Sequence, residues 1–143
     1  MKVNKEIIKL GQIEISFHFD SADTNGQFVM FEFSVPPNAK VPMPHYHEKF
    51  DEAAYGVEGV MTFNIDGKDI ELGPGESCFI PRGIVHGFIN NKQVTARVLS
   101  VITPALLGPE YFKELAEIIN AGGPPDIEKV KNVLNKYGLI PAV

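Results

Sequence analysis

Short runs of alternating apolar and polar residues, separated by turn-forming residues, constrain the fold of this chain more than any other feature of its sequence. Residues 13–19 carry Ile or Phe at every second position, and residues 29–35 repeat this alternation until Pro36 and Pro37 end it. A period of two is typical of a β-strand with one buried face. Proline cannot donate to a sheet ladder, so the second strand is expected to stop there.

Further runs of the same kind continue to residue 102. Asp66 and Gly67 stand between two of them and predict a hairpin, since both residue types tolerate the positive φ of tight turns. The Gly-Pro-Gly of residues 73–75 marks another turn. Seven or eight short strands without an intervening helix predict an all-β sandwich or barrel. These later strands are expected over residues 53–57, 60–65, 68–72, 77–80, 85–89 and 94–102.

Two helices are expected after residue 103. Apolar residues recur with helical spacing over residues 111–119, just after Pro109. A second helix is expected to begin near Asp126, a favourable N-cap, and to end at Gly138, where glycine accepts a left-handed conformation.

The chain has 143 residues, which suits one domain with a substantial core. We therefore predict a β-barrel over residues 1–103 and a helical extension of the same domain over residues 104–143. Two amphipathic helices must bury their apolar faces, either on the wall of their own barrel or on a second subunit. The sequence leaves both arrangements open.

Charge and composition exclude several classes of partner. The chain has 13 Lys and Arg against 18 Asp and Glu, a net charge of -5, and no basic cluster, so we expect no nucleic-acid partner. No stretch approaches the roughly 20 apolar residues of a membrane helix, and residues 1–10 lack a signal-peptide run. Cys78 is the one cysteine and cannot form an internal disulfide, which favours a reducing cytoplasm.

Three of the four histidines and one glutamate form a candidate metal site. His45 and His47 are two positions apart, and on an extended strand such residues point to the same face. Glu52 follows after enough residues for the chain to turn back, and His86 lies on a later apolar strand. Three imidazoles and one carboxylate suit one divalent transition metal (Fe, Mn, Ni, Co or Zn). Calcium prefers oxygen ligands alone.

The spacing of these residues resembles the first motif of the cupin superfamily. That motif runs glycine, five residues, His-x-His, three or four residues, glutamate, six residues, glycine. The chain has His45, His47, Glu52 and Gly59 at the matching positions. It departs from the motif at Ala39, where the first glycine of the family usually shapes a turn.

The second cupin motif matches at every position. It runs glycine, five residues, proline, any residue, glycine, two residues, histidine, three residues, asparagine. The chain has Gly75, Pro81, Gly83, His86 and Asn90. The resemblance implies a double-stranded β-helix (jelly-roll) barrel, a metal held by the three histidines and the glutamate, a small-molecule substrate and a homodimer.

Within that superfamily the chain is most similar to small, single-domain, quercetin-dioxygenase-like cupins. The similarity lies in residues 45–52, 79–83, 97–104 and 111–115. It implies a metal-dependent dioxygenase acting on a small aromatic or enediol-like substrate, with Glu52 as both ligand and catalytic base. A redox-neutral metal-dependent isomerase or decarboxylase, and a non-catalytic cupin that binds a small ligand, remain as alternatives, because this fold supports many chemistries.

Strand parity extends the prediction to the wall of the pocket. If Glu52 faces inward, Ala54 and Gly56 face inward too and leave space beside the metal for a ring-sized ligand. Phe88 shares the parity of His86 and is expected either to form an apolar wall for a flat substrate or to pack in the core.

Overall fold

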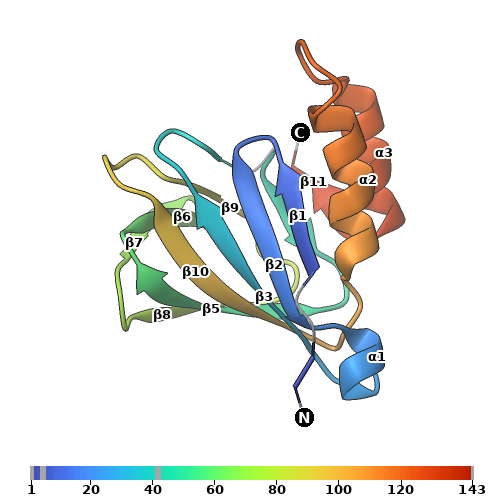
Figure 1. The fold of residues 1–143 in the computed structure, drawn as a ribbon, viewed down its shortest axis with the longest axis horizontal. Helices are drawn as coiled ribbons and strands as arrows, with labels where there is room; N and C mark the ends of the chain where they lie inside the picture. Colours follow the sequence, from blue (N-terminus) through green and yellow to red (C-terminus); the bar gives the residue numbers. More distant parts are fainter. Residues whose placement is uncertain (1, 4–5, 41–42, 143) are drawn as a thin grey trace.

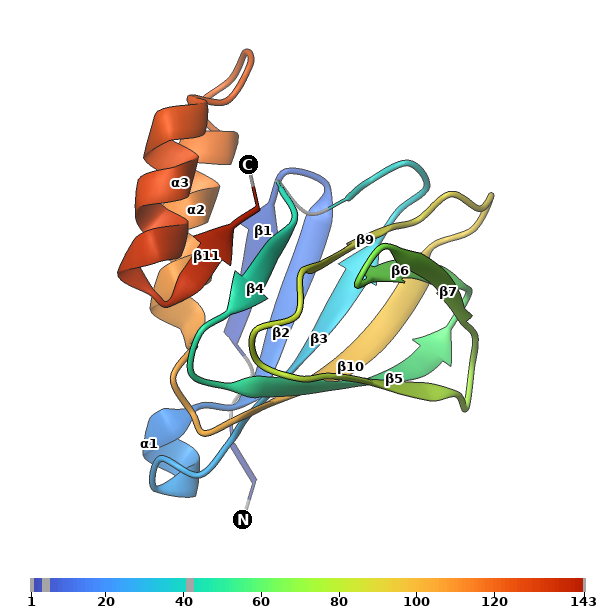
Figure 2. The same ribbon diagram turned by 180° about the vertical axis from the view of Figure 1, so that it is seen from behind.

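The chain folds into two antiparallel β-sheets packed face to face, with two helices at one side (Figures 1 and 2). The structure is a computed structural model that describes residues 2–3, 6–40 and 43–142. The strands are β1 (Glu6–Leu10), β2 (Ile13–Phe19), β3 (Val29–Val35), β4 (His45–His47), β5 (Asp51–Glu58), β6 (Met61–Ile65), β7 (Lys68–Leu72), β8 (Ser77–Ile80), β9 (His86–Ile89), β10 (Ala96–Thr103) and β11 (Leu139–Pro141). The helices are α1 (Ser21–Thr24), α2 (Pro109–Ile119) and α3 (Ile127–Lys136).

One sheet has the strand order β1-β2-β3-β10-β5-β8, and the other has the order β11-β4-β9-β6-β7. Every pairing within them is antiparallel. Strands that are neighbours in sequence lie in different sheets in several places, as when β4 leads into β5 (Figure 2). This arrangement confirms the predicted all-β jelly-roll barrel. None of the helices in the described part of the chain has the length and apolar character needed to span a membrane.

The core lies between the two sheets and is rich in phenylalanine. On β3, residues at every second position are buried, as the alternation predicts. Phe31 contacts Phe17 within the six-stranded sheet, at 5.1 Å between ring centroids. Phe33 reaches across to Phe88 on β9, at 5.0 Å and 61°. This edge-on aromatic contact joins the two sheets.

Both C-terminal helices pack on their own barrel. Pro109 is the first residue of α2, and the Asp126 side chain caps α3 by accepting a hydrogen bond from the Lys129 N–H at 3.2 Å. Gly138 has a φ of +80° and ends α3 in the left-handed conformation expected of it. Helix α2 lies along β1, and α3 contacts β11 (Figure 1). Of the two arrangements that the sequence left open, the structure has the first.

The short elements β1, α1 and β11 were not expected from the sequence, and β4 was expected only as the extended segment that carries His45 and His47. Strand β4 has only three residues, too few to show a periodicity. It is held on one side by β9 and on the other by β11, which follows α3 and pairs Leu139 with His47. The end of the chain therefore supports the strand that carries two of the histidines.

Candidate metal centre

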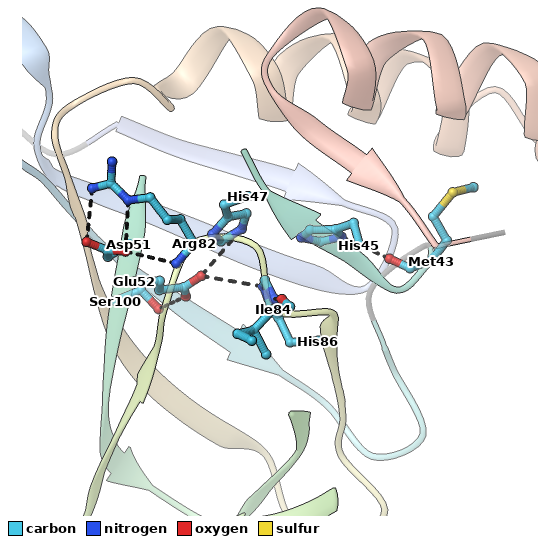
Figure 3. A network of polar contacts seen from close by, with 9 residues as sticks. All are labelled: Met43, His45, His47, Asp51, Glu52, Arg82, Ile84, His86 and Ser100. Carbon is cyan, nitrogen blue, oxygen red and sulfur yellow. Dashed lines mark hydrogen bonds and ion pairs between the residues drawn. The ribbon is translucent and has the colours of Figure 1, made fainter. Parts of the chain in front are cut away.

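The predicted ligand residues meet between the two sheets. His45 and His47 lie on β4 and His86 on β9, so all three come from the five-stranded sheet. His45 and His86 are direct cross-strand partners. Glu52 lies on β5 in the other sheet and points at the histidines from the opposite side (Figure 3). The three residues 48–50 connect β4 to β5, so ligands from the two facing sheets lie close together in sequence.

Distances within this cluster are short enough for one ion. One ring nitrogen from each histidine lies within 4.8 Å of the others. The Oε1 atom of Glu52 lies 3.8 Å from His47 Nε2 and 4.0 Å from His86 Nε2. Nitrogens bound to one metal at about 2.1 Å are roughly 3 to 3.5 Å apart, so a small inward movement of the rings would complete the coordination.

Backbone carbonyls fix the orientation of two of the rings. The Nδ1–H of His45 donates to the Met43 carbonyl, and that of His86 donates to the Ile84 carbonyl, each at 3.0 Å (Figure 3). With the proton on Nδ1, the Nε2 lone pair of each ring is directed at the centre of the cluster, as a metal requires. The tautomers of both rings are therefore compatible with metal binding.

His47 is held differently from the other two histidines. Its ring stacks on Phe50, at 4.4 Å between centroids and 25° between planes. Its Nδ1 atom is buried and has no hydrogen-bond partner among the described residues. A buried polar atom without a partner is unfavourable. Stacking, rather than a hydrogen bond, keeps this imidazole directed at Glu52.

All three histidines are neutral at physiological pH. Burial, together with the neighbouring His86, lowers the pKa of His45 to about 3 and that of His47 to about 2. Burial also lowers the pKa of His86. Metals bind neutral imidazole and compete with protons for it, so these shifts keep the cluster ready for a cation.

Glu52 is buried beside these neutral rings. Burial raises its pKa to about 7, against a hydrogen bond that holds the pKa down. The donor of that hydrogen bond is Ser100 on β10, whose Oγ lies 2.8 Å from Glu52 Oε2. One carboxylate oxygen is thus held by Ser100, while the other faces His47 and His86.

An ion pair outside the barrel holds the backbone around the cluster. The Asp51 carboxylate accepts hydrogen bonds from the Arg82 backbone N–H at 2.8 Å and from the Arg82 guanidinium at 3.0 and 3.2 Å. These bonds lower the pKa of Asp51. Asp51 begins β5 next to Glu52, and Arg82 lies in the loop before His86 (Figure 3). The contact therefore ties together the two segments that deliver facing ligands.

The cluster lines a largely apolar cavity of about 50 Å³. Phe88 is part of the wall of this cavity and also packs in the core against Phe33 and Phe63. Much of the rest of the wall comes from the C-terminal extension, which closes the cavity beside β1 and β4. The residues of that extension that line it are Leu107, Tyr111, Phe112, Leu115, Leu134 and Leu139.

Ala54 and Gly56 face the interior, as parity predicts, but they are not among the described residues that line the cavity. Gly56 has a different use. A Cβ atom there would lie 2.0 Å from the carbonyl oxygen of Gly73, in the turn between β7 and β8. Glycine at this position allows two backbone segments to touch, and it leaves no space beside the cluster.

Two polar residues at the site were missed by sequence reasoning. Ser100 stands on the inward face of β10 among buried apolar residues, so its parity could have identified it. Tyr111 lies on the apolar face of α2 and lines the cavity. An aromatic residue at a core position gives no sign of whether its hydroxyl faces a site, so no signal in the sequence points to Tyr111.

The second motif asparagine is a structural residue in this chain. Asn90 is fully buried and donates through Nδ2 to the carbonyls of Val35, at 2.9 Å, and Val94, at 2.8 Å. Its Oδ1 accepts from the Lys92 N–H at 3.0 Å. These bonds join the ends of β3, β9 and β10 and so hold the strand that carries His86.

Comparison with known proteins agrees with this geometry. A sequence model of the cupin domain matches residues 31–102. Quercetin 2,3-dioxygenase of Bacillus subtilis (strain 168) is 33% identical over 95 residues, which are 66% of this chain and 27% of that protein. The chain spans between 23% and 58% of the length of the curated relatives that it matches.

Solved structures of similar fold include enzymes of other kinds. The polyketide cyclase RemF from Streptomyces resistomycificus is 34% identical, with a TM-score of 0.59, over 76% of this chain and 86% of that one. A predicted oxalate decarboxylase from Thermotoga maritima has a TM-score of 0.64 over 71% of this chain and 93% of that one. At 24% identity the latter likeness shows the fold alone.

Proposed function

The chain belongs to the cupin family, and from that premise we propose that it is a metal-dependent dioxygenase acting on a small aromatic or enediol-like substrate. The proposed ligands are His45, His47, His86 and Glu52. The observation that carries the proposal is their arrangement: three neutral imidazoles and one buried carboxylate converge at the end of an otherwise apolar cavity. The similarity to quercetin 2,3-dioxygenase supports the dioxygenase reaction.

Iron, manganese, nickel or cobalt suits the proposed reaction better than zinc, since four protein ligands nearly close a tetrahedral zinc site. When bound, such a metal supplies Lewis acidity and a route for electrons between an organic substrate and dioxygen. The protein supplies the ligands and an apolar environment. Phe88 and the leucines of the cavity wall exclude water from the reacting groups.

Glu52 is the proposed proton acceptor. A pKa of about 7 allows its carboxylate to take a proton from a substrate hydroxyl at neutral pH and to release it again. Ser100 holds Oε2 at 2.8 Å, and Oε1 is the oxygen that faces His47 and His86. Loss of the hydroxyl proton makes an aromatic or enediol substrate electron-rich and therefore more easily oxidised by dioxygen.

A redox-neutral reaction is the second candidate, and the likeness to a polyketide cyclase favours it. RemF is similar to this chain over 86% of its own length, a larger share than the 27% of the quercetin dioxygenase. In such a reaction the same residues would hold a Lewis-acidic metal and move a proton through Glu52, without consumption of dioxygen.

The cavity must widen to admit an aromatic ring. Its volume of about 50 Å³ is smaller than the roughly 150 Å³ of an engineered protein cavity that binds benzene. Four of the wall residues of the C-terminal extension lie on α2 and α3 (Tyr111, Phe112, Leu115 and Leu134), so we expect these helices to shift when a ring-sized substrate enters.

Oxygen uptake distinguishes the two reactions. Metal-loaded protein is incubated with catechol, which has adjacent hydroxyls, and with its isomer resorcinol, which does not; quercetin serves as a larger substrate. We expect dioxygen to be consumed with catechol or quercetin, and uptake to disappear in His47→Ala. His18→Ala is the matched control, because His18 lies on β2 outside the cluster. Turnover that continues undiminished without oxygen would refute the dioxygenase and favour the redox-neutral reaction.

We also propose that the protein works as a cytoplasmic homodimer. Tyr55, Val57 and Phe79 are 48%, 37% and 58% exposed on β5 and β8, at one edge of the six-stranded sheet. Exposed apolar side chains that gather in this way suit a contact with a second copy. Light scattering should give twice the mass of the chain, and Phe79→Lys should give the monomer mass.

A further inference from the structure

Apart from the four proposed ligands, the cavity wall contains one polar side chain with a hydrogen-bonding group. Apart from this side chain and the four ligands, the described residues that line the cavity are leucine, isoleucine, phenylalanine and methionine. The exception is Tyr111, which comes from α2 in the C-terminal extension. The cavity therefore has polar groups from the barrel at one end and a phenolic hydroxyl from a helix in its wall.

Helix packing explains the position of Tyr111 but not its hydroxyl. The side chain is 4% exposed. Its ring makes edge-on contacts with Phe112, at 4.8 Å and 70°, and with Tyr137, at 5.7 Å and 71°. Phenylalanine would make the same contacts. The hydroxyl makes no hydrogen bond to another described residue. Among those residues His47 Nδ1 is the one fully shielded polar side-chain atom without a partner, so the Tyr111 hydroxyl is not completely shielded.

The hydroxyl is a donor that stays protonated. Burial raises the pKa of Tyr111, and the nearby negative charge of Glu52 raises it further. A phenol that keeps its proton can donate a hydrogen bond to a negatively polarised atom.

We propose that Tyr111 contacts the substrate and donates a hydrogen bond to an oxygen of it, or to an equivalent negatively polarised atom, inside the cavity. This inference rests on the proposed function, because it places one end of the ligand at the histidines. It narrows the substrate class to molecules with two such atoms: one that faces the histidines and Glu52, and one that faces α2. The C-terminal extension then contributes to specificity as well as closing the cavity.

Azide is a suitable probe, since it is a small linear anion whose two ends can each accept a hydrogen bond. Wild-type protein and Tyr111→Phe are loaded with Co²⁺, and azide is titrated against the visible cobalt spectrum. Loss of one hydrogen bond to an anion should weaken azide binding about tenfold or more. Tyr137→Phe is the control, because the Tyr137 hydroxyl donates to Glu114 outside the cavity and its loss should leave azide affinity unchanged.

A second measurement does not depend on the metal. Metal-free Tyr111→Phe should unfold at the same temperature as the wild type or slightly above it, since the variant loses a hydroxyl without a partner. A clear fall in the unfolding temperature would overturn the inference, because it would give the hydroxyl a structural partner.

The two proposals fail in different ways. Equal azide affinity in Tyr111→Phe and the wild type, with the same cobalt spectrum before azide is added, overturns only the role of Tyr111. A wild-type protein that takes up no Co²⁺ overturns the proposed function and this inference with it. Weaker azide binding in Tyr111→Phe alone, with unchanged cobalt content and stability, supports both.

Discussion

Replacement of Ser100 by alanine should weaken metal binding in a pH-dependent way. Ser100 makes a 2.8 Å hydrogen bond to Glu52, and both side chains are buried. This bond stabilises the ionised carboxylate and so opposes the effect of burial, which raises the pKa of Glu52 to about 7. Ser100→Ala removes the bond, so nothing then opposes the rise in the pKa of Glu52 that burial causes.

The size of the effect follows from the strength of the bond. A hydrogen bond to an ionised group contributes about 1.5 to 3 kcal/mol, and one pKa unit corresponds to about 1.4 kcal/mol. The pKa of Glu52 should therefore rise by about one to two units. A metal ligand must be ionised, so at and below pH 7 the metal affinity should fall by roughly tenfold to a hundredfold. Well above the new pKa, the carboxylate is ionised in both proteins and the difference should disappear.

The assay is competition for Co²⁺ between the protein and a chromophoric chelator, from pH 6 to pH 9. Ser77→Ala is the matched control, because Ser77 is exposed on β8. Equal affinity of Ser100→Ala and the wild type below pH 7 would refute the reasoning. A loss of the same size at every pH would do so too, since it would show that Ser100 acts on something other than the ionisation of Glu52.

Three predictions concern stability. Asn90→Ala should lower the free energy of unfolding in urea by about 3 kcal/mol, because the buried Val35 carbonyl and two partly buried backbone groups lose their partner; a change below about 1 kcal/mol would contradict this. Gly56→Ala should lower it by about 2 kcal/mol or more, since the new Cβ would lie 2.0 Å from a backbone carbonyl oxygen; unchanged thermal unfolding would contradict the close approach. Metal-free protein should lose stability as the pH falls below 6.5, because His45 and His47 take up protons near 6.5 when unfolded but only near pH 3 or below in the folded cluster. Glu52 acts in the opposite direction between about pH 4.5 and 7, but it binds one proton against the two of His45 and His47, so acid titration followed by circular dichroism should show a net loss.

Much of the barrel could be predicted because its strands are half-buried. A strand with one face in the core alternates in sequence, and β2 and β3 show this over seven residues each. The ligand strand β4 has three residues and no such pattern. Its pairing with β11, which lies more than 90 residues later in the chain, depends on where α3 places the C-terminus. Local sequence does not contain that information.

The candidate site was predictable where its residues follow a spacing, and not where they depend on packing. The histidines and Glu52 follow the two motifs, and the structure brings them together. The prediction of open space beside Ala54 assumed that inward-facing small residues border a pocket. In the structure Ala54 is buried and Gly56 lies against the backbone of Gly73, and the cavity is closed by side chains of the C-terminal extension. Which residues close a cavity depends on how distant elements dock.

Metal content is the most direct test of the central claim that the histidines and Glu52 form a metal centre. Elemental mass spectrometry on the untagged protein should find close to one transition-metal ion per chain. The ion should be lost in His86→Ala and retained in His18→Ala, since His18 lies outside the cluster. A wild-type protein that holds no metal after reconstitution, or a His86→Ala variant that holds as much as the wild type, would contradict the claim.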